Sequence, residues 1–202
     1  MKGKNFMQIY LLRHGETEEN KSRFYYGKLD VSLNDTGIVQ SRKAGELLKE
    51  IKFDSIYISD RKRTRETAEI ALNNKGLNLI ADKRINEIDF GKFEGKNYEQ
   101  IQREFPSEYE MWNNNWKEFA PPGGESYRQF YNRIKEFLED ILHKEQENVL
   151  IVTHGGVIRT IYCCVLEGNL DLYWKFSSKN CDISIIKYEY GNLFIDSISH
   201  VK

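Results

Sequence analysis

The sequence predicts an α/β protein in which a mostly parallel β-sheet carries helices on both faces, as a three-layer α/β/α sandwich. Two observations support this prediction. Short apolar runs typical of buried strands alternate with longer segments whose apolar residues recur at helical spacing. The chain of 202 residues contains no repeat, low-complexity segment or obvious linker, so we expect one domain over residues 1–202.

The elements can be placed in order along the chain. Runs rich in Ile, Leu, Val and Tyr predict strands over residues 8–12, 55–59 and 148–152, and two last strands over 183–188 and 193–198 around a Tyr-Gly-Asn turn. Helices are expected over residues 36–51, 62–72, 98–105, 108–116, 125–143 and 157–166, the first of them capped by Asn34 or Asp35. Pro121 and Pro122 interrupt a helical region, so we expect a helical and loop excursion at about residues 92–124, over the site.

The composition disfavours several classes of protein. A formal net charge of −1 gives no basic field to attract nucleic acid or an anionic membrane. No apolar run approaches the roughly 20 residues that span a bilayer, and residues 1–8 do not resemble a secretory signal. The three cysteines have no CxxC spacing, which disfavours a disulfide framework or a zinc site and suits reduced thiols in the cytoplasm. A homodimer is compatible with the sequence.

Two of the four histidines stand in the same unusual context. His14 and His154 each follow a predicted buried strand and precede a glycine, Gly15 or Gly155. The carboxyl ends of parallel strands meet at one edge of an open α/β sheet, where ligands bind. A glycine there lets the backbone turn tightly and brings an N–H group close to a ligand. We therefore expect both histidines at one binding site.

Cationic residues accumulate at the same predicted sheet edge. Arg13 precedes the first of these histidines, and Arg61, Lys62, Arg63 and Arg65 open the helix after the second strand. Because a helix N-terminus already favours anions, cations placed there are unfavourable unless an anion binds. Arginine also grips phosphate through two parallel N–H groups. The pattern predicts a phosphate pocket, with the remaining cations of the run solvated or ion-paired.

A proton donor is also needed if this pocket transfers phosphate. Phosphoryl transfer requires a nucleophile, stabilisation of charge and a proton for the leaving oxygen. The histidines and arginines supply the first two. Residues 84–91 have the alternating pattern of a strand, on which Glu87 and Asp89 face the same side. Either carboxylate could protonate the leaving group, and spacing alone leaves that choice open.

Taken together, the motifs resemble the histidine phosphatase (phosphoglycerate mutase-like) superfamily. Four blocks occur in the family's order over nearly the whole chain: LRHGET with Asn20 after it, KRTRETA with Arg63, NEIDFGKFEGK with Glu87, and THGGV with His154. The resemblance implies that His14 attacks phosphate in line, that Glu87 protonates the alcohol, and that water hydrolyses the phosphohistidine. It implies no metal and no cofactor.

The same resemblance assigns the remaining site residues. Phosphate oxygens would be held by Arg13, Arg63, Asn20 and His154. Further candidates for binding the substrate or its phosphate are Gly15, Tyr26, Gly27 and Gly155. Asn20 and Tyr26 have the alternative role of ordering their own loop.

Three segments resemble α-ribazole-5′-phosphate phosphatases: FYYGKLDV around Tyr26, PPGGES at 121–126 and YWKF at 173–176. Their aromatic residues suit a flat, dimethylbenzimidazole-like base. The resemblance therefore makes α-ribazole 5′-phosphate, in cobalamin nucleotide-loop assembly, the first substrate candidate. A broad-specificity phosphatase and a phosphoglycerate mutase-family enzyme with another small phosphoester remain alternatives.

Two hypotheses belong to other classes of protein. An inactive relative could bind phosphoesters, but such a protein has no need of a proton donor. A metal hydrolase is disfavoured because the histidines lack HxH or HExxH spacing and the neighbouring arginines would repel a divalent cation. The aromatic residues Trp112, Trp116 and Phe119 could form a lid over the site or pack in the core.

Overall fold

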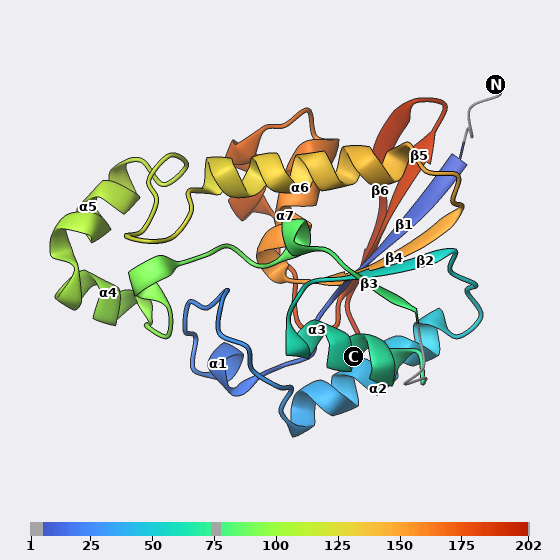
Figure 1. Cartoon of the computed structure of the whole chain (residues 1–202), viewed down its shortest axis with the longest axis horizontal. Helices are drawn as coiled ribbons and strands as arrows, with labels where there is room; N and C mark the ends of the chain where they lie inside the picture. The colour runs from blue at the N-terminus through green and yellow to red at the C-terminus, as the bar shows by residue number, and fades with distance from the viewer. Residues whose placement is uncertain (1–5, 74–77, 202) are drawn as a thin grey trace.

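The structure, a computed structural model, describes residues 6–73 and 78–201. The expectation that residues 1–8 are not a secretory signal falls largely on residues 1–5, which lie outside the described residues. The described strands are β1 (Phe6–Arg13), β2 (Ser55–Ile58), β3 (Leu79–Ala81), β4 (Asn148–Thr153), β5 (Ile183–Glu189) and β6 (Asn192–Ser199). They form one sheet in the order β3-β2-β4-β1-β5-β6 (Figure 1). The first four in this order are parallel, and β5 and β6 are antiparallel to their neighbours. The predicted mostly parallel sheet is confirmed.

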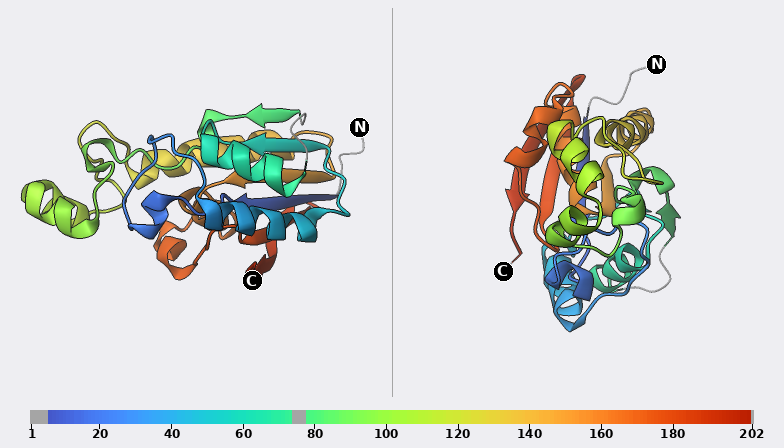
Figure 2. Two further views of the ribbon diagram at one scale, coloured as in Figure 1. Left: turned by 90° about the horizontal axis from the view of Figure 1, so that it is seen from below. Right: turned by 90° about the vertical axis from the view of Figure 1, so that its left-hand side faces the viewer.

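Helices cover both faces of this sheet, as predicted (Figures 1 and 2). The α-helices are α1 (Glu18–Lys21), α2 (Asp35–Leu48), α3 (Lys62–Ala71), α4 (Tyr98–Glu104), α5 (Pro106–Asn114), α6 (Tyr127–Leu142) and α7 (Gly155–Val165). Short 3-10 helices are η1 (Lys83–Ile85), η2 (Gly91–Phe93) and η3 (Leu170–Lys175). Within the described ranges, no helix has the length and apolar character needed to cross a membrane.

The central strand β1 is buried on both faces, which explains its continuous apolar sequence. Met7, Ile9 and Leu11 belong to the hydrophobic cluster that α6 and α7 cover. Tyr10 and Leu12 belong to the second cluster, which α2 and α3 cover on the opposite face. Because side chains alternate along a strand, each helical layer packs on every second residue of β1.

The segment containing α4 and α5 projects beyond the end of the sheet, at the left of Figure 1. Trp112 is 7 % exposed, and its ring centroid lies 5.4 Å from that of Tyr25. The ring of Trp116 lies 5.0 Å from Tyr127 and 5.8 Å from Trp174. Both tryptophans therefore pack against aromatic residues of the main body.

The segment around Glu87 differs from the sequence-based expectation. The alternating pattern of residues 84–91 predicts a strand, but the chain there is irregular between η1 and η2, so Glu87 and Asp89 do not share a strand face. The prediction that the long helix begins at Glu125 is also wrong. Ser126 is the N-cap of α6, in a capping box with Gln129. The predictions also omit β3 and the single-turn helix α1.

Candidate active site

The parallel pairing of β1 with β4 brings the two histidines together. Arg13 lies opposite Thr153 in this register, so the next residues, His14 and His154, leave the sheet side by side. Their ring centroids are 5.2 Å apart at an interplanar angle of 64°. The His14 N–H donates to the Thr153 carbonyl at 2.9 Å, which fixes the backbone at this point. Two residues far apart in sequence thus meet at one sheet edge.

His14 is held in a single tautomer. Its Nδ1 lies 2.7 Å from the carbonyl oxygen of Gly15, and because a carbonyl only accepts, Nδ1 carries the proton. Its Nε2 therefore presents a lone pair. Burial first, and then the charges of Arg63 and Arg13, lowers the pKa of His14 well below its usual value and keeps the ring neutral. A neutral imidazole with a free Nε2 is the form able to attack phosphorus.

Arg63 and His154 form a buried pair next to this ring. Arg63 is fully buried, and its Nε donates to His154 Nδ1 at 3.3 Å. Its Nη1 donates to the Leu29 carbonyl at 2.8 Å and its Nη2 to the Gly27 carbonyl at 3.3 Å. Because Nδ1 of His154 accepts, its Nε2 carries the proton and donates to Ser59 Oγ at 2.8 Å. Burial, and then Arg63, lowers the pKa of His154 well below its usual value, so this ring is also neutral.

Arg13 lies at the wall of a cavity beside these residues. One Nη donates to the Ser178 carbonyl, while Nε is buried and finds no hydrogen-bond partner within residues 6–73 and 78–201. A Cβ on Gly155 would lie 3.3 Å from this Nε, so the glycine leaves the guanidinium room. An unpaired, buried arginine donor is suited to an anionic oxygen.

Glu87 lies against the N-terminus of α7. Its Oε2 accepts the N–H of Gly156 at 3.0 Å, and its Oε1 accepts the N–H of Ile88 at 3.0 Å. A Cβ on Gly156 would lie only 2.2 Å from Oε1, so the carboxylate occupies the space that the second glycine of THGG leaves free. Asp89 points elsewhere, into an ion pair with Lys28 at 2.6 Å. Of the two carboxylates, only Glu87 lines the cavity.

The cavity has a volume of about 190 Å³. Its lining combines a few polar groups with many aromatic rings: Arg13, Asn20, Phe24, Tyr25, Tyr26, Glu87, Ile88, Phe90, Tyr127, Gly155, Gly156, Arg159, Tyr173 and Trp174. The side chains of His14, Arg63 and His154 are buried and are not part of the lining. Such a mixture of apolar walls and few convergent polar groups is typical of a site for a small molecule.

Three aromatic residues form what we call the aromatic wall: Tyr127, Tyr173 and Trp174. Tyr173 lies 5.1 Å from Tyr127 and 4.8 Å from Trp174, both edge to face. The guanidinium of Arg159 lies over the rings of Tyr173 and Trp174, at 5.7 and 5.5 Å. Its Nε is buried with no hydrogen-bond partner among the described residues. Arg159 therefore adds to the wall a cation whose Nε–H donor is unused.

Asn20 and Tyr26 line the cavity and also order their own loop. Tyr26 Oη and Thr17 Oγ1 share a hydrogen bond of 2.8 Å, and the guanidinium of Arg63 lies 4.7 Å above the Tyr26 ring. Asn20 Oδ1 accepts from the N–H of Thr17 at 3.3 Å and from Asn180 Nδ2 at 3.1 Å. Both side chains are thus fixed by protein contacts at positions that face the cavity.

Gly15 and Gly27 occupy tight packing positions outside the cavity lining. A Cβ on Gly15 would lie 2.5 Å from the Gly37 carbonyl oxygen, and one on Gly27 would lie 1.9 Å from the Ile88 carbonyl oxygen. The first glycine allows α2 to approach His14. The second allows the Tyr26 loop to approach the segment that carries Glu87.

The sequence analysis gives no individual role to three residues that matter to this geometry: Ser59, Gly156 and Arg159. The doubled glycine after His154 is a local signal for Gly156, and Arg159 follows it by one helical turn on the same face of α7. Ser59 carries no such signal. Among residues 6–73 and 78–201, no group of three His, Cys, Asp or Glu side chains is arranged to hold a metal ion.

Comparisons with known proteins agree with this arrangement. Residues 9–200 match the family model of the histidine phosphatase superfamily, branch 1. The chain is 33 % identical over 184 residues to phosphoserine phosphatase 1 of Hydrogenobacter thermophilus, which covers 91 % of this chain and 87 % of that protein. It is 28 % identical over 171 residues to adenosylcobalamin/alpha-ribazole phosphatase of Escherichia coli K12, with 84 % of each chain covered.

Solved structures show the same likeness. The crystal structure of the alpha-ribazole phosphatase from Shigella flexneri matches with a TM-score of 0.91 and 26 % identity, covering 96 % of both chains. The family match spans nearly the whole chain and includes all four motifs. This protein therefore belongs to branch 1 of the histidine phosphatase superfamily, and the expectation of a phosphoric monoester hydrolase is confirmed.

Proposed function

We propose that this phosphatase acts through a phosphohistidine on His14 and that its principal substrate is α-ribazole 5′-phosphate. The observation that carries the mechanism is the tautomer of His14, whose Nδ1 is committed to the Gly15 carbonyl. Nε2 attacks phosphorus as the P–O bond to the alcohol breaks. The carboxylic acid of Glu87 gives its proton to the leaving oxygen. Water then attacks phosphorus as the P–N bond to His14 breaks and returns a proton to Glu87, so that inorganic phosphate is released.

The arginines supply charge stabilisation in this proposal. The free Nε of Arg13 donates to a phosphate oxygen without giving up a protein partner. Arg63 and His154 reach phosphate by exchanging the bonds they make within the protein, the carbonyls of Leu29 and Gly27 among them. No metal takes part, so turnover is expected to survive a chelator.

The aromatic wall supports α-ribazole phosphate as the substrate. Flat rings beside the phosphate site suit a planar, apolar base, and Trp174, which lines the cavity, is 53 % exposed. The likeness to alpha-ribazole phosphatases from Escherichia coli and Shigella flexneri supports the same assignment. By this assignment the enzyme serves cobalamin nucleotide-loop assembly in the cytoplasm.

Phosphoserine is a second candidate, and Arg159 is the observation that favours it. A guanidinium at the cavity wall whose Nε–H has no partner in the described part of the chain would attract a substrate carboxylate, which α-ribazole phosphate lacks. The sequence relative at 33 % identity is named a phosphoserine phosphatase.

Values of kcat/KM on a panel of phosphoesters in EDTA test both substrates. The panel contains α-ribazole 5′-phosphate, phosphoserine, 3-phosphoglycerate, fructose 2,6-bisphosphate and p-nitrophenyl phosphate, with His14→Ala as the control. A preference of about a hundredfold for α-ribazole phosphate supports the proposal, because binding differences of this size require specific contacts. A preference of the same size for phosphoserine would make phosphoserine the substrate in place of α-ribazole 5′-phosphate. Low and similar kcat/KM values on all the esters would identify a broad-specificity phosphatase. A complete lack of turnover would identify an inactive relative.

Two variants test the chemistry itself. His14→Ala is expected to abolish turnover while the protein stays folded. Glu87→Gln is expected to slow alkyl phosphates far more than p-nitrophenyl phosphate, whose leaving oxygen hardly needs a proton. Equal losses on both esters would remove Glu87 as the general acid.

A further inference from the structure

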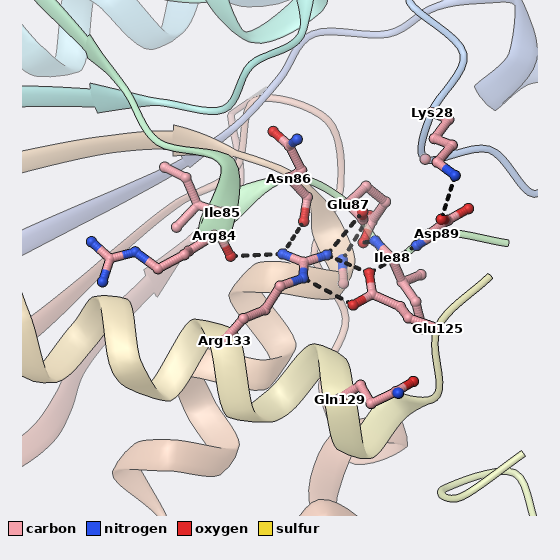
Figure 3. A network of polar contacts seen from close by, with 12 residues as sticks. Lys28, Arg84, Ile85, Asn86, Glu87, Ile88, Asp89, Glu125, Gln129 and Arg133 are labelled. Carbon is pink, nitrogen blue, oxygen red and sulfur yellow. Dashed lines mark hydrogen bonds and ion pairs between the residues drawn. The ribbon is translucent and has the colours of Figure 1, made fainter. Parts of the chain in front are cut away.

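The segment that carries Glu87 has no regular secondary structure to hold it. Residues 86–90 lie between η1 and η2 and belong to neither a helix nor a strand. Backbone carbonyl groups in such a segment need donors from elsewhere, because an unpaired buried polar group is costly. Figure 3 shows that a single side chain from α6, Arg133, provides donors to two carbonyls of this segment, those of Asn86 and Glu87.

Arg133 donates to three carbonyl oxygens, two in this segment and one in η1 just before it. Its Nη1 donates to Arg84 at 2.6 Å and to Asn86 at 2.9 Å, and its Nη2 donates to Glu87 at 3.2 Å (Figure 3). One planar guanidinium thus takes the place that a neighbouring strand would occupy in a sheet. The carbonyl of Glu87 itself is one of the three, so Arg133 acts directly on the backbone of the proposed acid.

Glu125 completes the arrangement from the loop before α6. Its carboxylate binds Arg133 through two bonds, from Nη2 to Oε1 at 2.5 Å and from Nε to Oε2 at 3.0 Å. Its Oε1 also accepts the N–H of Asp89 at 3.0 Å, and its own N–H donates to the Asp89 carbonyl at 3.0 Å. Arg133 and Glu125 together therefore hold the backbone on both sides of Glu87.

One further contact and its burial stabilise this pair. The guanidinium of Arg133 lies 4.6 Å above the ring of Phe130, one turn earlier on α6. The side chains of Arg133 and Glu125 are only 22 % and 18 % exposed. A bidentate pair that is largely shielded from water is far more rigid than a surface ion pair.

We propose that Arg133, oriented by Glu125, is a positioning residue that sets the place of the Glu87 carboxylate for proton transfer. Neither Arg133 nor Glu125 lines the cavity, and the guanidinium of Arg133 is committed to Glu125 and to three backbone carbonyls. The inference rests on the proposed function, in which Glu87 is the general acid. It assigns a role in the reaction to a polar network that lies behind the site.

The test compares Arg133→Lys with a matched control on the same helix. A lysine keeps the charge but cannot serve three carbonyls and two carboxylate oxygens in one plane. Arg128→Lys is the control, because Arg128 also pairs with a single glutamate, Glu118, but makes no contact with the Glu87 segment. Glu125→Gln, which keeps the shape of the side chain, is the second test variant. Circular dichroism and thermal midpoints are measured for all three.

Leaving-group dependence separates positioning from a purely structural role. For Arg133→Lys we expect kcat on an alkyl phosphate to fall about 10- to 100-fold, with KM little changed. On p-nitrophenyl phosphate we expect a loss of about twofold or less. Glu125→Gln should show the same pattern more weakly, and Arg128→Lys should match the wild type. Equal losses on both esters, or none, would overturn the inference.

A double variant distinguishes this inference from the proposed function. If Arg133 acts through Glu87, adding Arg133→Lys to Glu87→Gln causes no further loss on the alkyl ester. If the loss in the double variant equals the product of the losses in the two single variants, Arg133 acts independently of Glu87. If Glu87→Gln itself shows no leaving-group dependence, the assignment of the acid fails, and the positioning role fails with it. If only Arg133→Lys lacks that dependence, the proposed function stands and the positioning role is wrong.

Discussion

Replacing Gly156 with alanine tests the placement of Glu87 from the cavity side. The added Cβ would lie 2.2 Å from Glu87 Oε1 and 3.0 Å from Tyr173 Oη. Because carbon–oxygen contacts are normally no closer than about 3.3 Å, the carboxylate must move by about 1 Å. A displacement of that size at a reacting group costs about a hundredfold in rate.

A second estimate gives the same magnitude. The move also breaks the bond from the Gly156 N–H to Glu87 Oε2, now 3.0 Å long. A hydrogen bond to a charged group contributes about 1.5–3 kcal/mol, which corresponds to roughly 10- to 150-fold. We therefore expect Gly156→Ala to lower kcat on an alkyl phosphate by about a hundredfold, and to lower it much less on p-nitrophenyl phosphate.

Gly155→Ala is the matched control, one residue away on the same helix. Its Cβ would meet Arg13 Nε at 3.3 Å and does not approach Glu87. We expect a smaller loss, mainly in KM, that is equal for the two esters. Steady-state kinetics on both esters and thermal midpoints of both variants make the comparison. A loss for Gly156→Ala that does not depend on the leaving group would refute the reasoning.

Buried histidines, a buried hydroxyl and the cation of the aromatic wall each give a further prediction. The folded-state pKa of His14 and of His154 is lowered, so the unfolded chain binds more protons below about pH 6.5 and stability is lost as the pH falls. Between pH 7.5 and 5.5 the unfolding free energy should therefore fall, and His14→Gln should weaken this pH dependence; urea titrations that show no difference between the two proteins would contradict it. Ser59→Ala leaves the buried Nε2–H of His154 unpaired and should destabilise the fold by about 1–3 kcal/mol, measured by the same titrations, whereas unchanged stability would remove the assigned tautomer. Arg159→Met should lower kcat/KM for phosphoserine roughly tenfold or more while sparing p-nitrophenyl phosphate; equal effects on both would exclude a carboxylate contact.

The sheet and the proximity of the two histidines could be predicted from the sequence for a physical reason. Short apolar runs followed by helical spacing predict parallel strands, and the carboxyl ends of such strands share one edge. The structure places His14 and His154 at that edge, with their rings 5.2 Å apart. What the pattern could not reveal is that β1 and β4 are direct neighbours, because strand order depends on contacts between segments far apart in the chain.

The irregular segment around Glu87 shows where periodicity fails. Its alternation of apolar and polar residues matches a strand. Three carbonyls in it or just before it nevertheless accept hydrogen bonds from a guanidinium on α6 and not from a neighbouring strand. A pattern of period two reports which side chains are buried and carries no information on which group donates to the backbone. The start of α6 is marked more clearly in the sequence, because Ser126 and Gln129 have the spacing of a capping box.

The position of β1 in the sheet has a consequence for synthesis of the chain on the ribosome. β1 is made first, but its two neighbours, β4 and β5, begin only at Asn148 and Ile183. At common rates of translation this apolar strand waits on the order of 10 s for either partner, with its edges open to other chains. A nascent chain that stops before β4 also lacks His154. Protection of β1 from aggregation and a complete active site are therefore acquired together, when the segment from β4 onward emerges.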